Sequence, residues 1–236
     1  MSVTSDVAIL GAGIIGAACA NALSREGLRV AIIERSVVAG GATAAGMGHI
    51  VVMDDSAEQF ALTNYSRDLW QQMAEALPRE VEFETRGTIW VAADDEEMDA
   101  VRQKHAYYTA RRVRAEVLES AALGEAEPNL RPGLAGGLLV PDDSIIYAPC
   151  AADWFLKQAQ MRGATLHIGQ PATEVRQNEV RLRDGTTLEA LRLCAPPEHG
   201  WLSCFPASEC GLARAILRSR IVPPDLYSIN WSNSDI

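Results

Sequence analysis

A glycine-containing turn between two apolar runs constrains the fold more than any other feature of the first forty residues. Val7–Leu10 is a short, continuous apolar run, which is typical of a strand buried on both faces. The sequence Gly-Ala-Gly-Ile-Ile-Gly follows at once, and the small residues of 17–27 favour a helix. A second apolar run, 29–33, leads directly into Glu34. This order predicts a strand–helix–strand unit with parallel strands.

Each residue of the turn has a physical role in holding an anion. Gly11 permits a tight turn, Gly13 allows the backbone to approach a diphosphate, and Gly16 lets the helix pack closely on the strand. The helix N-terminus offers unpaired N–H groups and a favourable dipole to the anion. Glu34 lies 18 residues after Gly16, where its carboxylate can accept hydrogen bonds from ribose hydroxyls and would disfavour the 2′-phosphate of NADP. The alternative is a buried strand–helix–strand unit that binds nothing. The residues predicted to bind a dinucleotide are Gly11, Gly13, Ile15, Gly16, Glu34 and Arg35.

The turn alone does not choose between FAD and NAD, and the following loop favours FAD. Residues 36–49 read Ser-Val-Val-Ala-Gly-Gly-Ala-Thr-Ala-Ala-Gly-Met-Gly-His and have little side-chain bulk. Such a segment suits a chain that passes close along a long, flat cofactor and offers it N–H groups and the hydroxyl of Thr43. A flexible surface loop is the alternative interpretation of the same composition.

The sequence resembles the D-amino acid oxidase (DAO) superfamily of FAD-dependent oxidoreductases. The resemblance rests on 11–16, on Glu34-Arg35 and on 41–49, and it extends in the family's order to about residue 193. The block 41–55 is most similar to the D-hydroxyproline dehydrogenase and opine oxidase β subunits, within the group that includes glycine and sarcosine oxidases. The resemblance implies FAD as cofactor, and it implies that Val175 contacts the adenine through its backbone. It also places a further set of residues beside the flavin: Ala42, Thr43, Ala44, Gly46, Met47 and Gly48.

The middle of the chain alternates helical and strand patterns. Apolar residues at helical spacing predict a helix over 58–77, and the charged segment 94–121 also favours a helix with a solvated face. Pro149 suits the first turn of a helix reaching Met161, and Asp184-Gly185 is typical of a hairpin turn. Strands are predicted at 81–84, 87–92, 136–141, 144–147, 163–168 and 171–175.

These patterns predict an α/β fold with a Rossmann-like, three-layer FAD/NAD(P)-binding domain, and the family resemblance implies in addition an incomplete α+β substrate domain. The resemblance implies a discontinuous FAD-binding domain, comprising 1–85 and 145–193, with 86–144 as part of a substrate domain. Residues 194–236 hold three of the five cysteines and five of the eleven prolines and show no helical or strand period. A single-base frameshift near 191–194 would explain this aberrant tail, because a neighbouring frame permits a family-like Ala-Gly-Ala-Trp sequence.

The charge and amino-acid composition of the chain argue against several classes of binding partner. The formal charge of −10 argues against nucleic acid and against a polybasic grip on anionic lipid. The cysteines lack metal-ligand spacing and fit a reducing, cytoplasmic compartment, so no metal is expected. The apolar run 7–23 is short and interrupted by glycine, so no transmembrane segment is expected.

The resemblance implies oxidation of the C–N bond of a small amine or D-amino or imino acid, as in D-hydroxyproline dehydrogenase. It leaves the catalytic residues unknown. Partner subunits of a dehydrogenase complex would place the protein at the periphery of the inner membrane. Two alternatives stay open: an NAD-linked dehydrogenase, and an inactive remnant that at most binds a nucleotide.

Overall fold

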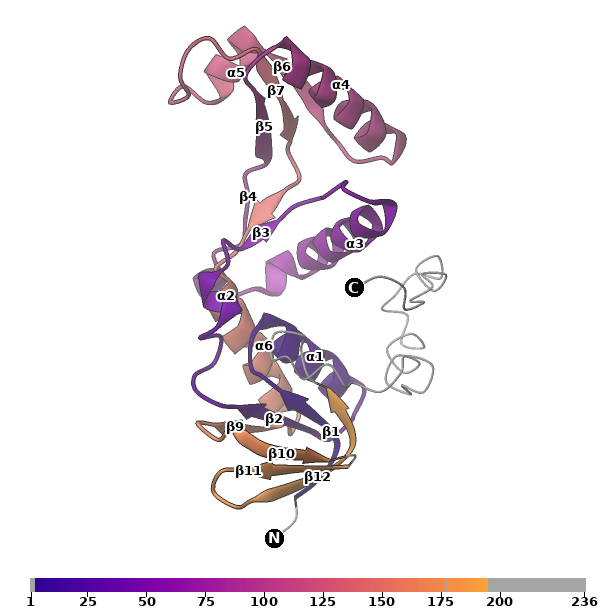
Figure 1. Cartoon of the computed structure of the whole chain (residues 1–236), viewed down its shortest axis with the longest axis vertical. Helices are drawn as coiled ribbons and strands as arrows, with labels where there is room; N and C mark the ends of the chain where they lie inside the picture. The colour runs from indigo at the N-terminus through magenta and orange to yellow at the C-terminus, as the bar shows by residue number, and fades with distance from the viewer. Residues whose placement is uncertain (1–2, 177, 195–236) are drawn as a thin grey trace. The chain divides into compact units, whose positions relative to one another are not determined.

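The computed structural model describes residues 3–176 and 178–194. Its helices and strands form two compact units, each built from segments that are separated in the sequence (Figure 1). Within the described residues, the first unit comprises 3–47, 77–81, 147–176 and 178–194, and the second comprises 48–76 and 82–146. The predicted functional domains divide the chain at somewhat different points. Their assignment to FAD and to substrate stays a prediction.

A six-stranded sheet forms the centre of the first unit, in the order β10-β11-β12-β1-β2-β9. Strands β12, β1, β2 and β9 are parallel, whereas β10, β11 and β12 form an antiparallel meander. The strands are β1 (Val3–Leu10), β2 (Val30–Glu34), β9 (Thr165–Ile168), β10 (Ala172–Arg176), β11 (Glu179–Leu182) and β12 (Thr187–Cys194).

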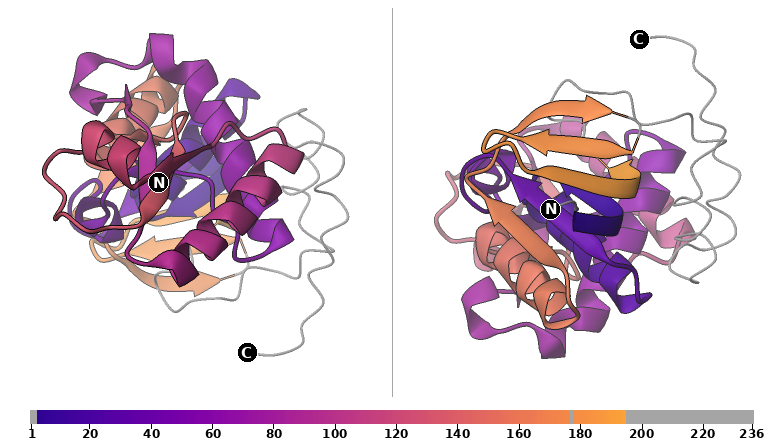
Figure 2. Two further views of the ribbon diagram at one scale, coloured as in Figure 1. Left: turned by 90° about the horizontal axis from the view of Figure 1, so that it is seen from above. Right: turned by 90° about the horizontal axis from the view of Figure 1, so that it is seen from below.

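The side chains of β1 point alternately to the two faces of the sheet, and each face is covered by a further layer. Helices α1 (Ile14–Arg25) and α6 (Ala148–Met161) pack against each other. Ile9 faces α1, while Ala8 faces the meander, where it joins a buried cluster with Val180 and Leu188. Figure 2 shows β10–β11–β12 on one side of β1 and β2, with α6 on the other. The predicted three-layer, Rossmann-like α/β fold is therefore confirmed. The unit also contains α2 (Ala42–Ala45) and the short 3₁₀ helix η2 (Arg79–Val81).

The second unit contains two small antiparallel sheets and three α-helices. One sheet has the order β3-β8-β4 and the other β5-β7-β6. The strands are β3 (His49–Ile50), β4 (Glu84–Thr85), β5 (Thr88–Ala92), β6 (Glu116–Glu119), β7 (Gly136–Val140) and β8 (Ser144–Ile145). The helices are α3 (Ala57–Met73), continued by the 3₁₀ helix η1 (Ala74–Ala76), α4 (Asp95–Ala110) and α5 (Ser120–Ala126).

Both faces of the β5–β7–β6 sheet are covered. Leu138 of β7 packs in a buried cluster with Met98 and Tyr108 of α4, whereas the next residue, Leu139, packs against a cluster that includes Leu123 of α5. Successive residues of a strand point to opposite faces, so a single strand supports helices on both sides. This arrangement explains why 136–140 reads as a continuous apolar run.

Most predicted elements are confirmed, and two are wrong. The segment 81–84 is not a continuous strand, because the chain forms η2 and then the short β4. The charged segment 94–121 is not one helix. It leaves helical geometry at Arg112, whose φ is 62°, and continues into β6 and α5. The loop predicted at 36–49 also contains the single-turn helix α2.

Among the described residues, none of the helices has both the length and the apolar character needed to span a bilayer. The predicted out-of-frame tail 194–236 begins at Cys194, which is the last residue of β12, and its residues 195–236 lie outside the described residues.

Candidate nucleotide-binding site

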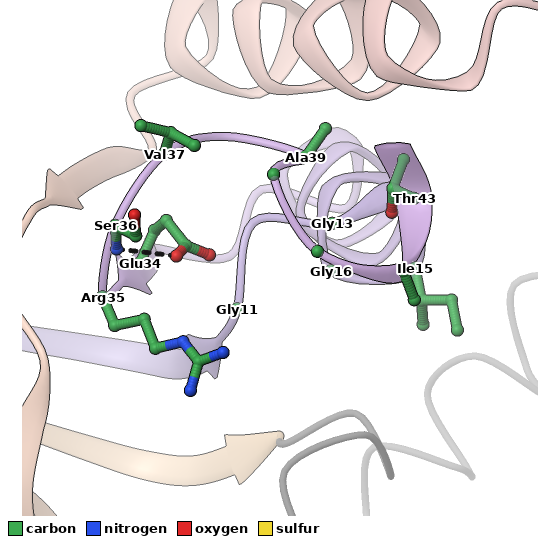
Figure 3. Close-up of a pocket in the computed structure, with 13 residues that line it drawn as sticks. Gly11, Gly13, Ile15, Gly16, Glu34, Arg35, Ser36, Val37, Ala39 and Thr43 are labelled. Atoms are coloured by element: carbon green, nitrogen blue, oxygen red, sulfur yellow. Dashed lines mark hydrogen bonds between the residues drawn. The ribbon is translucent and has the colours of Figure 1, made fainter. Parts of the chain in front are cut away.

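A pocket opens where β1 and β2 end and α1 begins (Figure 3). Its volume is about 230 Å³, which is below the roughly 300–1,000 Å³ of complete small-molecule pockets. The described wall therefore surrounds only part of a dinucleotide. The pocket is lined by Gly11, Gly13, Ile15, Gly16, Glu34, Arg35, Ser36, Val37, Ala39, Gly40, Gly41, Ala42 and Thr43.

The glycine turn leaves no room for side chains. Gly11 has a φ of 106°, which favours glycine, and its N–H donates to the carbonyl of Ile33 across 2.8 Å. A Cβ on Gly16 would lie 2.1 Å from the carbonyl oxygen of Gly11. A Cβ on Gly13 would lie 2.9 Å from Oγ1 of Thr43. The geometry agrees with a tight turn at Gly11 and close packing of α1 at Gly16, and the approach of a diphosphate to Gly13 stays a prediction.

The first turn of α1 presents main-chain N–H groups to the pocket. Gly13 is the N-cap and has no side chain with which to cap the helix. Thr43 supplies the missing acceptor from a distant part of the sequence, because the Ile14 N–H donates to its Oγ1 across 3.0 Å. The first hydrogen bond within the helix runs from the Ala17 N–H to the Gly13 carbonyl. The amides of Ile15 and Gly16 therefore lack acceptors within the helix, which suits an anionic ligand.

Main-chain hydrogen bonds orient the carboxylate of Glu34. Its Oε2 accepts from the Ala12 N–H across 2.9 Å, and its Oε1 accepts from the Ser36 N–H across 2.8 Å. The residue is buried at the end of β2, while Arg35 is exposed at the pocket rim. Each carboxylate oxygen has a second lone pair, so both can still accept from a ligand hydroxyl. Figure 3 shows Glu34 across the pocket from Gly16 and Thr43.

The pocket gathers eight of the thirteen residues predicted to bind the cofactor, which are Gly11, Gly13, Ile15, Gly16, Glu34, Arg35, Ala42 and Thr43. Five others do not line it. Ala44, Gly46 and Met47 are exposed at and after α2, Gly48 belongs to the second unit, and Val175 is 41% exposed on β10. Their contacts with a cofactor stay predictions.

The sequence interpretation expected 36–49 to pass along the cofactor but named no site residue within 36–41, five of whose residues line the pocket. Ala39 anchors this segment, because its N–H donates to the carbonyl of Ala12 across 3.0 Å, and its φ is 55°. A positive φ at alanine has no sequence signal of its own. The adjacent Gly40-Gly41 pair was the available indication of a close chain path.

The link between Thr43 and α1 gives a testable prediction. We expect Thr43→Val to lower the free energy of unfolding by about 1 kcal/mol, as for loss of an N-cap acceptor. Thr43→Ser keeps the hydroxyl and should stay within about 0.5 kcal/mol of the unsubstituted chain. Urea denaturation of the three proteins measures the difference. A serine variant that loses more stability than the valine variant would show that the methyl group, and not the hydrogen bond, is what matters.

Together, the parallel sheet, glycine turn, capped helix and acidic β2 terminus define a dinucleotide-binding protein of the Rossmann-like class. Residues 6–203 match the family DAO, described as FAD dependent oxidoreductase, and the chain belongs to this family. FAD is the cofactor of the family. The residues present fit the ADP end of FAD, because Ile15 and Gly16, whose amides have no acceptor within α1, line the pocket together with the oriented carboxylate of Glu34.

Proteins of similar sequence and structure also include oxidoreductases. The glycine oxidase of Geobacillus kaustophilus (strain HTA426) is 31% identical over 184 residues, covering 73% of this chain and 48% of the oxidase. A crystal structure of glycine oxidase from G. kaustophilus matches with a TM-score of 0.76 and 27% identity, covering 82% of this chain and 55% of that structure. The glycerol 3-phosphate dehydrogenase of Caloramator mitchellensis is 30% identical over 144 residues, covering 60% of this chain and 30% of that protein. The chain thus spans about half the length of its glycine oxidase relative.

Proposed function

We propose that this chain binds FAD through the pocket at the ends of β1 and β2. It would be the nucleotide-binding part of an oxidoreductase acting on the C–N bond of a small amine or a D-amino or imino acid. The observation that carries the proposal is the cradle formed by the glycine turn, the first turn of α1 and Glu34. When bound, FAD would provide the group that accepts a hydride from the carbon bearing the nitrogen.

The diphosphate has a specific place in this proposal. The amides of Ile15 and Gly16 would donate to its oxygens, because Thr43 already satisfies Ile14. The positive end of the α1 dipole would stabilise the negative charge. Glycine at position 13 protects this arrangement, because a Cβ there would lie 2.9 Å from the Thr43 Oγ1 that accepts from the Ile14 N–H.

The ribose of the AMP half would lie against Glu34. Two main-chain N–H groups hold the carboxylate in position, so it would accept ribose hydroxyls without reorganising. A 2′-phosphate would be repelled by the same charge, so NADP is disfavoured. Beyond this pocket we propose, on the family resemblance, that Ala44, Gly46, Met47 and Gly48 lie along the flavin and Val175 contacts the adenine.

The proposed substrate class and domain roles rest on the resemblance of 41–55 to the D-hydroxyproline dehydrogenase β subunits. We propose a D-hydroxyproline-like substrate, held by a substrate domain that includes 86–144, with the FAD-binding domain formed by 1–85 and 145–193. The name glycine oxidase, borne by one relative, supports a small amino acid substrate. A cytoplasmic location and partner subunits of a dehydrogenase complex belong to the same proposal.

Titration of the purified chain with FAD, FMN and NAD tests the proposal through quenching of flavin fluorescence and through calorimetry. FMN lacks the AMP half and forfeits the charge-assisted bonds at Glu34, each worth about 1.5–3 kcal/mol. We expect FMN to bind at least about tenfold more weakly than FAD. NAD binding tighter than FAD would support the rival NAD-linked dehydrogenase, and binding of neither would support an inactive remnant.

Glu34→Ala should weaken FAD binding by about 10- to 100-fold, because the ribose loses its acceptor and the Ala12 and Ser36 amides lose theirs. Glu26→Ala is the matched control, since Glu26 is an exposed acid at the other end of α1. Circular dichroism confirms that each variant is folded. Equal FAD affinity in the Glu34 and Glu26 variants would contradict the ribose contact.

A further inference from the structure

Two cysteines far apart in the sequence, Cys19 of α1 and Cys194 of β12, face each other in the first unit. Cys194 is the register partner of Ile9 in the parallel β1–β12 pair. Paired residues of parallel strands project to the same face of the sheet. The face is the one covered by α1, because a Cβ on Gly16 would lie 3.4 Å from Cγ2 of Ile9. The side chain of Cys194 therefore points toward α1.

Separate observations agree with this orientation. Leu193 packs on the opposite face, in the meander cluster, so strand alternation turns Cys194 toward α1. Cys19 lies one helical turn after Gly16 and thus on the same side of the helix. A hydrogen bond from the Cys194 thiol is the main cause of the lowered pKa of Cys19, which agrees with side chains that lie close together, and both residues are partly buried free cysteines.

The hydrogen bond makes the two thiols chemically unequal. It lowers the pKa of Cys19, because the donated proton stabilises the Cys19 thiolate. The same bond raises the pKa of Cys194, and burial adds to the effect. The pair therefore loses its first proton from Cys19. A thiolate is the nucleophile in thiol oxidation, so Cys19 is the attacking sulfur and Cys194 the resolving one.

We propose that Cys19 and Cys194 form a peroxide-oxidisable dithiol, a modification site that links α1 covalently to β12. The Cys19 thiolate attacks one oxygen of hydrogen peroxide, breaks the O–O bond and becomes a sulfenic acid, while hydroxide leaves and takes up a proton as water. The Cys194 sulfur then attacks the sulfenic sulfur. The S–S bond forms, the S–O bond breaks, and the Cys194 proton leaves with the hydroxyl as a second water. Two thiols are oxidised by two electrons, and the peroxide is reduced.

The disulfide would tie the helix that supplies the pocket amides to strand β12. Such a bond closes a long loop and restricts the unfolded chain. Oxidation should therefore raise the urea midpoint of the first unit and be reversed by dithiothreitol. The proposal does not depend on FAD binding, because the two thiols meet through the packing of α1 on the sheet.

Peptide mapping tests the proposal on the full chain carrying Cys204→Ser and Cys210→Ser. These substitutions leave Cys194 as the single cysteine of the tryptic peptide 193–214, while Cys19 is the single cysteine of peptide 1–25. Folded protein is treated with stoichiometric hydrogen peroxide, alkylated and digested. We expect one species in which the two peptides are joined with the loss of two hydrogens. It should disappear after reduction and should not predominate when oxidation is performed in denaturing urea.

Single substitutions of Cys19, Cys194 and Cys150 show which cysteines form the joined species. Cys19→Ser and Cys194→Ser should each abolish the joined species, whereas Cys150→Ser, which alters the remaining described cysteine, should leave it unchanged. The intact mass of the unsubstituted chain should fall by two hydrogens under the same treatment, which provides a measurement independent of any variant. Separate alkylation of Cys19 and Cys194 in folded, peroxide-treated protein would overturn the proposal, as would over-oxidation of Cys19 without a link.

Discussion

Gly16→Ala is expected to lower the free energy of unfolding by about 3 kcal/mol or more, the upper range for overpacking in a rigid site. The new Cβ would lie 2.1 Å from the carbonyl oxygen of Gly11 and 3.2 Å from its carbonyl carbon, both backbone atoms. These atoms cannot retreat easily, because the Gly11 N–H is bonded to Ile33 across the sheet. Either α1 or the turn must move.

Such a movement would also remove the amides from the pocket, so FAD binding should be lost with the stability. Urea denaturation and FAD titration measure the two effects. Gly124→Ala is the matched control, because a Cβ there meets nothing within 4 Å, and Gly124 lies within helix α5. Helix propensity alone should stabilise that variant by up to about 1 kcal/mol. A Gly16→Ala protein as stable as the Gly124→Ala protein would show that the turn is not rigid.

Arg67→Met is expected to cost about 3–5 kcal/mol of folding free energy by breaking a buried ion pair in the second unit. Nη1 of Arg67 lies 3.6 Å from Oδ1 of Asp143, and their side chains are 7% and 1% exposed. Asp143 also accepts a hydrogen bond from the Val52 N–H across 3.3 Å. Removal of the guanidinium would leave a buried carboxylate without its countercharge. Arg86→Met is the control, because the Arg86–Glu84 pair is largely exposed and should contribute no more than about 1 kcal/mol.

The loss of folding free energy in Arg67→Met should depend on pH. Burial raises the pKa of Asp143 above its ordinary value, outweighing the hydrogen bonds from Thr88 and Val52 and the charge of Arg67. A carboxyl with a raised pKa binds its proton more tightly in the folded state, so stability falls as pH rises from 3.8 through the raised value. Loss of Arg67 raises that pKa further, because the favourable charge is gone.

The destabilisation should therefore be largest at neutral pH and shrink as the pH is lowered. Adding Asp143→Asn should recover part of the loss at neutral pH, because the neutral amide does not need a countercharge. Urea denaturation at several pH values measures both effects. A deficit that is independent of pH and is not relieved by asparagine would point to lost packing of the Arg67 side chain instead of lost charge pairing.

The strand–helix–strand unit could be predicted because all of its signals are local. The apolar runs, the spacing of Gly11, Gly13 and Gly16, and the acid after the second run lie within one short segment. Each residue type is required by the backbone geometry at its own position, so sequence and structure agree there. The same locality explains the correct prediction of α6, which has Pro149 in its first turn.

Features that depend on distant partners could not be predicted. Strand β1 begins at Val3, before the apolar run, because Val3 pairs with Leu188 of β12. Strand β6 lies in a charged segment and forms because Val117 and Leu118 pair with β7. The Thr43 cap on Ile14 and the Arg67–Asp143 pair likewise join residues whose proximity arises only after folding.

A crystal structure of the chain with FAD tests the central claim most directly. We expect diphosphate oxygens within about 2.7–3.2 Å of the Ile15 and Gly16 amide nitrogens, and a ribose hydroxyl at the same range from the Glu34 carboxylate. FAD bound elsewhere, or a diphosphate that avoids the first turn of α1, would contradict the account.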